Sequence, residues 1–167
     1  MTLRSILADG LVACIPFTLV VWASFVAKPR LWLHSLPPDI RAMALPKSAA
    51  ERRATVWMGA LVLLCFFGVP SFLTWRLHAG VPGGLSFRDA LTHLWGVWMI
   101  VNTWDLVAMD WPYAYLMDPG RPPIPGTRGA RGYKDYGFHF RAFLKASVFG
   151  PAVVVPVAFV ISLLPGG

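Results

Sequence analysis

The first long apolar stretch of the chain, residues 6–27, reads ILADGLVACIPFTLVVWASFVA. Three more follow, at residues 54–75, 90–109 and 146–165. A helix needs roughly 20 residues to cross a bilayer core of about 30 Å, and each stretch approaches or exceeds this length. Because lipid offers the backbone no hydrogen-bond partners, segments that cross it must be helical. The sequence therefore predicts an all-α integral membrane protein, a bundle of four transmembrane helices.

The composition agrees with a membrane protein. Hydrophobic residues make up 56% of the chain and charged residues only 14%, whereas charged residues are about 25% of soluble domains. The eight Trp and eleven Phe residues suit a protein with two lipid–water boundaries, where aromatic rings collect. The 167 residues leave room for a single domain, and we expect its helices at about residues 6–27, 49–76, 88–111 and 142–164.

The Lys and Arg residues are unequally distributed between the segments that connect the apolar stretches. Three of the 15 lie in the N-terminal tail and the second connection: Arg4, Arg76 and Arg88. The other twelve lie in the first and third connections, within residues 28–53 and 121–145. By the positive-inside rule, these two connections are cytoplasmic and both chain termini lie outside.

The net charge of +7 has two interpretations, a nucleic-acid partner or contact with anionic lipid. Because the basic residues flank the apolar stretches, the charge indicates topology and lipid headgroups, and no nucleic acid is expected as a partner. The candidates for anionic-lipid contact are Lys28, Arg30, Arg52 and Arg53. The expected partners are therefore membrane lipids, together with other membrane subunits or a second copy of the chain.

Capping residues and prolines predict where helices begin, end and bend. Ser48-Ala-Ala-Glu51 is a capping box, which predicts that the second helix begins near residue 49. Ser86-Phe-Arg-Asp89 predicts a similar start for the third helix. Pro112 follows the third helix and is expected to end it. Prolines at positions 16, 70, 151 and 156 fall inside the other stretches and predict kinks.

The first and third connections are expected to contain structure. In the first, Pro37-Pro-Asp39 predicts the start of a short helix that lies on the cytoplasmic surface. The third begins with residues 118–127, DPGRPPIPGT, which are too rich in proline and glycine for a helix or a central strand. Residues 132–141, GYKDYGFHFR, are dense in aromatic rings, which is uncommon in a disordered linker. We therefore expect the third connection to fold against the cytoplasmic face.

A carboxylate inside the third apolar stretch is the most unusual polar residue of the chain. Asp110 lies at the predicted cytoplasmic boundary beside Trp111, but Asp105 lies five residues deeper, about 7–8 Å along a helix. An intramembrane carboxylate costs about 2.5 kcal/mol or more unless it is paired, hydrated or protonated. Asn102 is three residues before Asp105 and shares its face. This face is expected to look into the bundle.

Three interpretations of Asp105 remain open. The first is a structural ion pair with Lys145 or Arg141, with His139 and the pair Arg52–Arg53 as further candidates. The second is a polar pocket just inside the cytoplasmic surface, which would hold a lipid headgroup, a phosphate or a metal-bound substrate. Its predicted residues are Asn102, Asp105, Asp110, His139, Arg141 and Lys145. The third is exposure to a water-filled crevice.

No bound metal or cofactor is expected. Asp105, Asp110 and His139 are suitable ligand types, but five residues along an α-helix leave the two aspartates roughly 140° apart. They are therefore not expected to share a face. Cys14 and Cys65 lie in separate stretches without CxxC spacing, and neither a disulfide nor a metal site is indicated.

Two further polar residues lie near the outer ends of the predicted helices. His93 has no second intramembrane histidine with which to hold a haem, and its position is typical of a hydrogen-bonded packing residue. Asp9, near the start of the first helix, is an interfacial acid that could face Arg76, Arg88 or His93.

Two segments in about the last 70 residues together resemble a known group of proteins. Residues 104–111, WDLVAMDW, precede the turn Pro125-Gly-Thr127 and the segment GYKDYGFHF at residues 132–140. This pattern resembles small, uncharacterised bacterial four-helix integral membrane proteins, in which an Asp…Asp-Trp helix end is followed by a Pro-Gly-Thr loop. Arg128 departs from the pattern, because an acid is expected there. The resemblance supports a folded third connection, and no activity, cofactor or catalytic residue is carried over from the group. The expected location is the inner (plasma) membrane, as a multi-pass protein.

The sequence leaves three functions open, and does not decide whether the protein is an enzyme. The first is a non-enzymatic accessory or scaffold component that binds lipid or other membrane subunits, favoured by the absence of catalytic motifs. The second is a small membrane enzyme that acts on a lipid or phosphate-bearing substrate at the cytoplasmic face. In it, Asp105 or Asp110 would be base or ligand, and Arg141 and Lys145 would be anion clamps. The third is an oligomeric channel or carrier in which Asp105 relays protons or cations.

Overall fold

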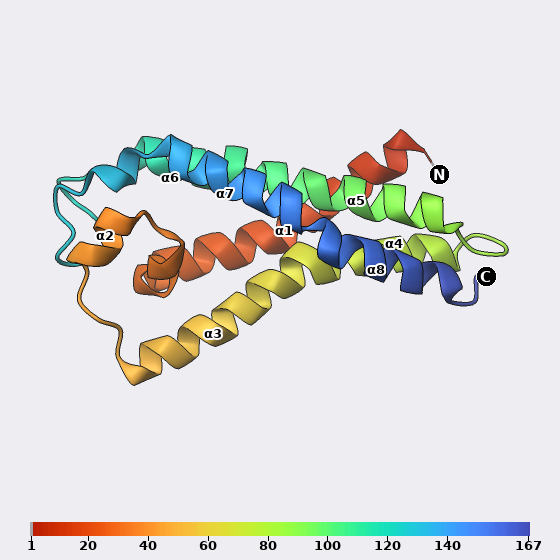
Figure 1. Ribbon diagram of the computed structural model, residues 1–167, viewed down its shortest axis with the longest axis horizontal. Helices are drawn as coiled ribbons and strands as arrows, with labels where there is room; N and C mark the ends of the chain where they lie inside the picture. The colour runs from red at the N-terminus through yellow and green to blue at the C-terminus, as the bar shows by residue number, and fades with distance from the viewer. Residues whose placement is uncertain (1) are drawn as a thin grey trace.

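The computed structural model describes residues 2–167, and within this range the chain forms helices and loops but no strand. Four long helical rods run along the molecule (Figure 1). They are α1 (Leu3–Ala27), α3–η2–α4 (Ala49–Leu63, Leu64–Gly68 and Val69–Ala79), α5–η3–α6 (Phe87–Trp104, Asp105–Asp110 and Trp111–Leu116) and α7–α8 (Tyr136–Phe149 and Pro151–Leu163). The predicted all-α class is confirmed.

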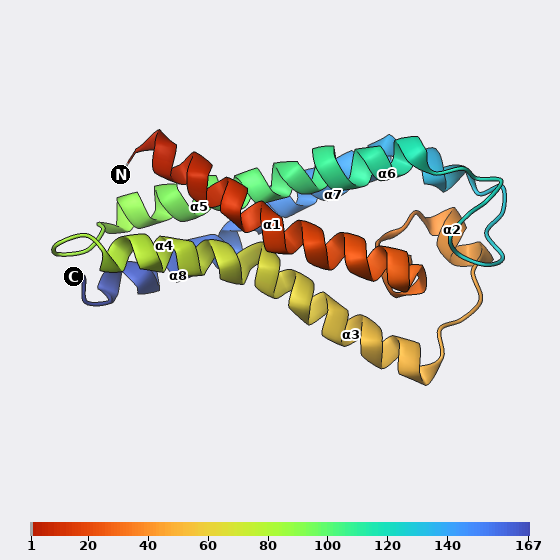
Figure 2. The same cartoon turned by 180° about the vertical axis from the view of Figure 1, so that it is seen from behind.

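The two ends of the molecule carry different parts of the chain. Figures 1 and 2 show both termini at one end, beside the α4–α5 connection. The opposite end, here called the loop end, carries η1 (Pro29–Ser35), α2 (Pro38–Met43), η4 (Arg131–Lys134) and the connection after α6. The first and third connections, which hold most of the basic residues, therefore lie together.

Three of the rods have the length and apolar character of membrane spans. These are Leu3–Ala27, Ala49–Ala79 and Tyr136–Leu163, and most of their apolar residues lie on the surface of the structure. The fourth rod is more polar, because it carries His93, Asn102 and Asp105. Its first part, α5, contacts α1, α4, α7 and α8. The most polar rod is thus enclosed by the apolar ones.

Aliphatic and aromatic side chains pack around α5. Val97, Trp98 and Val101 are fully buried. The Trp98 indole stacks on Phe67 of η2, with ring centroids 5.7 Å apart and an interplanar angle of 13°. Phe66 meets the same indole edge-on. Offset and edge-to-face aromatic contacts favour a defined arrangement of the helices that carry them.

Glycines allow α1 to cross α5 closely. A Cβ atom at Gly10 would lie 2.9 Å from Ile100 Cγ2, and one at Gly96 would lie 2.6 Å from Ile6 Cγ2. Both distances are well below the optimal carbon–carbon separation of about 3.5–4.0 Å. The two backbones can therefore approach only because these positions lack side chains, which is a common packing mode between membrane helices.

Two rods contain a π-helical segment just before a proline. η2 precedes Pro70 and η3 precedes Pro112, and the Trp111 N–H bonds to the Leu106 carbonyl five residues earlier. Wider π turns of this kind re-pair backbone groups next to a proline, which itself has no N–H to donate. The prediction that Pro112 ends the third helix was wrong for this reason, and the rod continues through α6 to Leu116.

Side-chain caps set the starts of all four rods, and that of α1 is a capping box between Thr2 and Ser5. The predicted caps at Ser48–Glu51 and Ser86–Asp89 are both present, with each serine hydroxyl accepting a hydrogen bond from a backbone N–H three residues later. The last rod begins six residues before its predicted start at residue 142. Its cap is the Asp135 carboxylate, which accepts a hydrogen bond from the Phe138 N–H (2.8 Å), so that α7 begins at Tyr136.

The first and third connections fold together at the loop end. Ile40 of α2 is buried in one small core with Ile124 and Tyr133 of the third connection. The Asp39 carboxylate accepts a hydrogen bond from the Gly132 N–H (2.7 Å) and joins the two connections. The predicted short helix is therefore present as α2, and the predicted folding of the third connection is confirmed.

The Pro-Gly-Thr turn belongs to this small core. Thr127 is fully buried, and its hydroxyl donates to the Ile124 carbonyl (2.7 Å). The Tyr133 hydroxyl lies 2.7 Å from the Thr127 hydroxyl oxygen and donates its hydrogen to that oxygen. Burial raises the pKa of the Tyr133 phenol. Gly126 has a φ of 86°, a left-handed conformation that glycine adopts without strain.

The helix α3 leaves the bundle as it approaches the loop end. Both views show it diverging from the other rods (Figures 1 and 2). No side chain of α3 is buried, and Val56 and Trp57 are 71% and 77% exposed. An apolar groove lies between α3 and the end of α1. The bundle is therefore wider at the loop end than at the end that carries the termini.

Candidate functional site

A cavity of about 190 Å³ lies near the loop end, bounded by α1, η1, η3, α6 and α7. Its polar lining residues are Ser35, Asp105, Asp110 and His139. Its apolar and aromatic lining residues are Val21, Trp22, Phe25, Trp32, Leu36, Met109, Tyr113 and Ala142. The cavity thus brings together three of the six residues predicted to form a polar pocket.

The π-helical segment η3 places two aspartates on the same cavity. Asp105 and Asp110 are its first and last residues, and both line the cavity. A π-helix has i→i+5 hydrogen bonds, so residues five apart lie about one turn apart. The prediction that the two aspartates do not share a face assumed α-helical geometry and was wrong for that reason.

Asp110 is paired with a histidine from another helix. Its Oδ1 atom lies 3.0 Å from Nδ1 of His139, which is buried on α7. His139 had been considered as a partner for Asp105, and the structure pairs it with Asp110 instead. The contact joins η3 to the first turns of α7. A carboxylate that holds an imidazole nitrogen orients the ring and can stabilise its protonated form.

The ion pair expected for Asp105 is not formed. Within residues 2–167, no cationic side chain lies within ion-pair distance of its carboxylate. The Arg141 guanidinium lies 3.6 Å from Asp135, and Lys145 is exposed on the outer face of α7. Neither lines the cavity. Asp105 therefore has neither of these cations as a partner.

Asn102 joins α5 to α7 outside the cavity. Its side-chain amide donates a hydrogen bond to the Ser147 hydroxyl (3.0 Å), and this hydroxyl donates to the Phe143 carbonyl (2.9 Å). Asn102 is buried, so this pairing satisfies a group that would be costly to leave without a partner. Its role is helix packing beside the cavity.

Aromatic residues from distant segments form the remaining walls. The Trp32 indole N–H donates to the Ser24 hydroxyl (3.0 Å), which fixes η1 against α1. Phe25 meets the Tyr113 ring edge-on, with centroids 4.8 Å apart. The Tyr113 hydroxyl is buried without a hydrogen-bond partner in the described chain. Only the aromatic content of these segments is visible in the sequence, because the contact between them depends on how η1 folds back.

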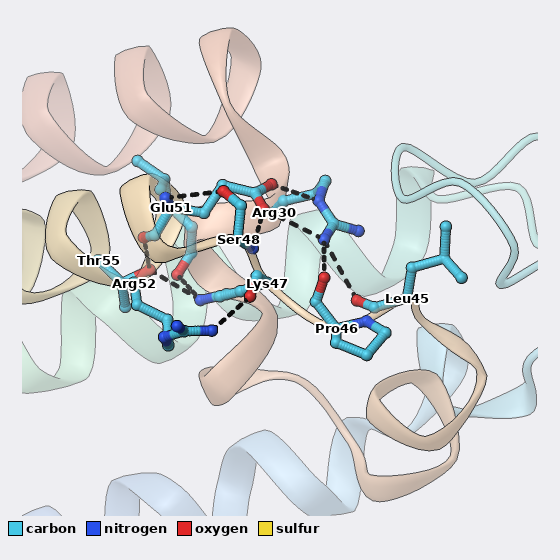
Figure 3. A network of polar contacts seen from close by, with 9 residues as sticks. Arg30, Leu45, Pro46, Lys47, Ser48, Glu51, Arg52 and Thr55 are labelled. Carbon is cyan, nitrogen blue, oxygen red and sulfur yellow. Dashed lines mark hydrogen bonds and ion pairs between the residues drawn. The ribbon is translucent and has the colours of Figure 1, made fainter.

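The basic residues predicted to contact lipid differ in their surroundings. The Arg30 Nε donates to Glu51 Oε1 (2.6 Å), and its Nη2 donates to the Leu45 and Pro46 carbonyls (both 3.2 Å; Figure 3). Arg30 therefore ties η1 to the start of α3. Arg52 donates to the Lys47 carbonyl (2.7 Å) from an exposed position. Two further predicted residues are exposed, Lys28 and Arg53.

A second polar cluster lies toward the end that carries the termini. The Arg76 Nη2 lies 2.8 Å from Asp9 Oδ1, and His93 Nε2 lies 3.5 Å from Asp9 Oδ2. The other ring nitrogen of His93 is 3.0 Å from the Thr74 hydroxyl. The predicted hydrogen-bonded packing role of His93 is confirmed, and Asp9 faces two of its three expected partners. This cluster joins α1, α4 and α5.

The geometry of the cavity differs from that of a metal centre. Among residues 2–167, no three His, Cys, Asp or Glu side chains converge closely enough to hold a metal ion. Comparison with known protein families, curated proteins and solved structures finds no match to this chain. The functional argument therefore depends on the cavity itself.

Proposed function

We propose that this chain is a multi-pass protein of the plasma (inner) membrane that binds a lipid or another membrane subunit as a non-enzymatic accessory component. All four rods cross the bilayer, the loop end is cytoplasmic, and both termini lie outside. Two features support this topology. Three rods are apolar over the length of a span, and twelve of the 15 Lys and Arg residues lie in the two segments gathered at the loop end.

The outward faces of the rods support contact with lipid. Leu11, Ile15 and Leu19 of α1 are 59%, 60% and 65% exposed, and they recur every four residues along one face. Such a face would be unfavourable in water, whereas hydrocarbon surrounds it at no cost. The polar residues of the fourth rod turn inward, as polar groups in membrane bundles generally do.

The single observation that carries the binding role is the cavity at η3. It combines unpaired Asp105 with aromatic walls. An unpaired carboxyl group at this depth is unfavourable in the empty protein unless it is hydrated, protonated or satisfied by a ligand. A bound group that satisfied Asp105 would therefore be favoured at this position.

The His139–Asp110 pair supports an enzyme as the second candidate. Histidine and carboxylate at 3.0 Å can accept and return a proton. The anion clamp proposed for such an enzyme is not supported, because neither Arg141 nor Lys145 lines the cavity. A channel has less support still. A channel needs a polar path through the bundle, whereas Val97 and Val101 are fully buried on α5 between Asp105 and the polar cluster at Asp9.

The test is native mass spectrometry of the full chain, gently extracted from its own membrane, with Asp105→Asn and the exposed control Asp118→Asn in parallel. The proposal expects a retained lipid or protein subunit in the parent and the Asp118 variant, and loss of a retained lipid in the Asp105 variant. A chain that carries no lipid or subunit would refute the binding role. Turnover of a lipid that depends on His139 would establish the enzyme instead.

A further inference from the structure

Carboxyl groups outnumber basic side chains in the lining of the cavity at η3. Asp105 and Asp110 both line it, and no Lys or Arg does. His139 contacts one of these carboxylates and leaves Asp105 without a cationic partner among the described residues. An anionic group placed here would meet two carboxylates in a site of reduced dielectric, where like charges repel strongly. The cavity therefore disfavours phosphate and other anions.

The walls of the cavity suit a cation. Trp22, Phe25 and Trp32 supply aromatic rings beside the carboxylates. Aromatic faces attract ammonium groups, tryptophan most strongly, and carboxylates next to aromatic walls are a recurrent way of holding substituted ammonium ions. Tyr113 lines the same cavity with a side chain that is only 9% exposed.

The remaining lining and the location of the cavity suit an apolar chain next to that cation. Apart from Ser35, the rest of the lining is apolar: Val21, Leu36, Met109 and Ala142. The cavity lies beside the loop end, where the headgroup region of a bilayer would be. A molecule with a small cationic head and an apolar tail would place the head at Asp105 and leave the tail among apolar side chains or in lipid.

We propose that this cavity binds an ammonium group carried on an apolar chain, with Asp105 and Asp110 as counter-charges and Trp22 and Trp32 as aromatic walls. The proposal rests on the binding function proposed above and names the ligand class of the same site. The ammonium belongs either to an amine-bearing membrane lipid or to a free alkylammonium amphiphile, and the chemistry of recognition is shared.

The first experiment is calorimetric titration of the full chain in neutral maltoside micelles with four chain-matched probes: octylammonium, octyltrimethylammonium, octanol and octyl sulfate. Micelles without protein give the blank for partitioning. We expect both ammonium probes to bind at least ten-fold more tightly than octanol, and octyl sulfate not to bind. Equal binding of octanol, or tighter binding of octyl sulfate, would overturn the ammonium assignment while leaving a binding site in place. Failure of all four probes would overturn it too.

Three variants locate the site. Asp105→Asn is expected to weaken ammonium binding at least ten-fold, and Asp118→Asn, the same change on an exposed turn, is expected to leave it unchanged. Trp22→Leu keeps an apolar wall and is expected to weaken octyltrimethylammonium more than octanol. Far-UV circular dichroism checks that each variant is folded. Ammonium binding that survives Asp105→Asn and Trp22→Leu unchanged would place the ligand elsewhere and refute the proposal.

The source of the ammonium is decided by reconstitution. The chain is placed in nanodiscs of phosphatidylglycerol, with and without phosphatidylethanolamine, and then examined by native mass spectrometry. Selective retention of phosphatidylethanolamine that Asp105→Asn abolishes identifies a lipid headgroup. Binding of the soluble octyl probes without such retention identifies a free amphiphile. Retention of phosphatidylglycerol alone, lost in Asp105→Asn, would support the binding function and refute the ammonium class.

Discussion

Replacement of Gly10 by alanine tests the close crossing of α1 and α5. The new methyl group would overlap Ile100, whose Cγ2 and Cβ atoms would lie 2.9 Å and 3.0 Å away. Alanine favours the helix over glycine by about 1 kcal/mol, whereas overpacking typically costs about 1–3 kcal/mol. Gly59→Ala in α3 is the matched control, because a methyl group there meets nothing within 4 Å. The helix-propensity gain is common to both variants, so their difference isolates the cost of overlap.

We therefore expect Gly10→Ala to be less stable than Gly59→Ala by about 1–3 kcal/mol. The free energy of unfolding is measured in mixed micelles by steric trapping or by titration with sodium dodecyl sulfate, followed by far-UV circular dichroism. Ile100→Ala removes the overlapping Cγ2 atom and keeps only Cβ, so the double variant Gly10→Ala/Ile100→Ala should be more stable than the sum of the single effects predicts. Equal stability of the two alanine variants, or strict additivity in the double variant, would refute the packing argument.

Three further changes probe other parts of the fold. Gly84→Ala should lower the free energy of unfolding by about 1 kcal/mol or more, because Gly84 has a φ of 74° and a methyl group there would lie 2.8 Å from His78 Nε2. Thermal unfolding measures this change. Thr127→Val should cost about 1–3 kcal/mol and speed proteolysis of the third connection, because it leaves the buried Tyr133 hydroxyl without a partner. Burial, together with nearby cations, lowers the pKa of His34 from its usual value of 6.5, so its stabilising effect is present above this pH and is lost as the pH falls; the unfolding midpoint should drop between about pH 7 and 5.

Each of these predictions has a control within the chain. Gly83→Ala shares the positive φ of 75° but meets nothing within 4 Å, so it should cost less than the change at Gly84. Thr55→Val removes a threonine hydroxyl from α3 and should leave proteolysis of the third connection unchanged. His34→Gln should reduce the pH dependence, and an unchanged pH profile in this variant would contradict the role of His34. The cations that face His34 are Lys47 and Arg41.

The helices were predictable because hydropathy and capping are local properties. The apolar stretches locate all four rods, and the caps at Ser48–Glu51 and Ser86–Asp89 lie where the side chains predict. The predicted end at Pro112 was wrong, because a switch from α to π geometry lets the rod continue past this proline to Leu116. The π turn keeps backbone groups hydrogen-bonded from residue i to residue i+5, and prediction rules based on α-helical spacing do not include such a turn.

The candidate site was predictable only in part. Asp105 stands out in the sequence because an ionisable residue inside an apolar stretch is rare. Its surroundings depend on rotations of helices about their axes, which place Arg141 and Lys145 outside and bring Trp22 and Trp32 inside. Rotations of this kind follow from packing over the whole bundle and are not encoded in any single segment.

The divergence of α3 gives the molecule a tapered shape with a direct consequence for the bilayer. A cross-section that is broader at the loop end displaces more lipid area from one leaflet than from the other. On a small vesicle, the favoured orientation places the broad end in the outer leaflet, because the convex surface has the larger area. Membrane curvature therefore becomes a variable that distinguishes this chain from a cylindrical helical bundle of the same length.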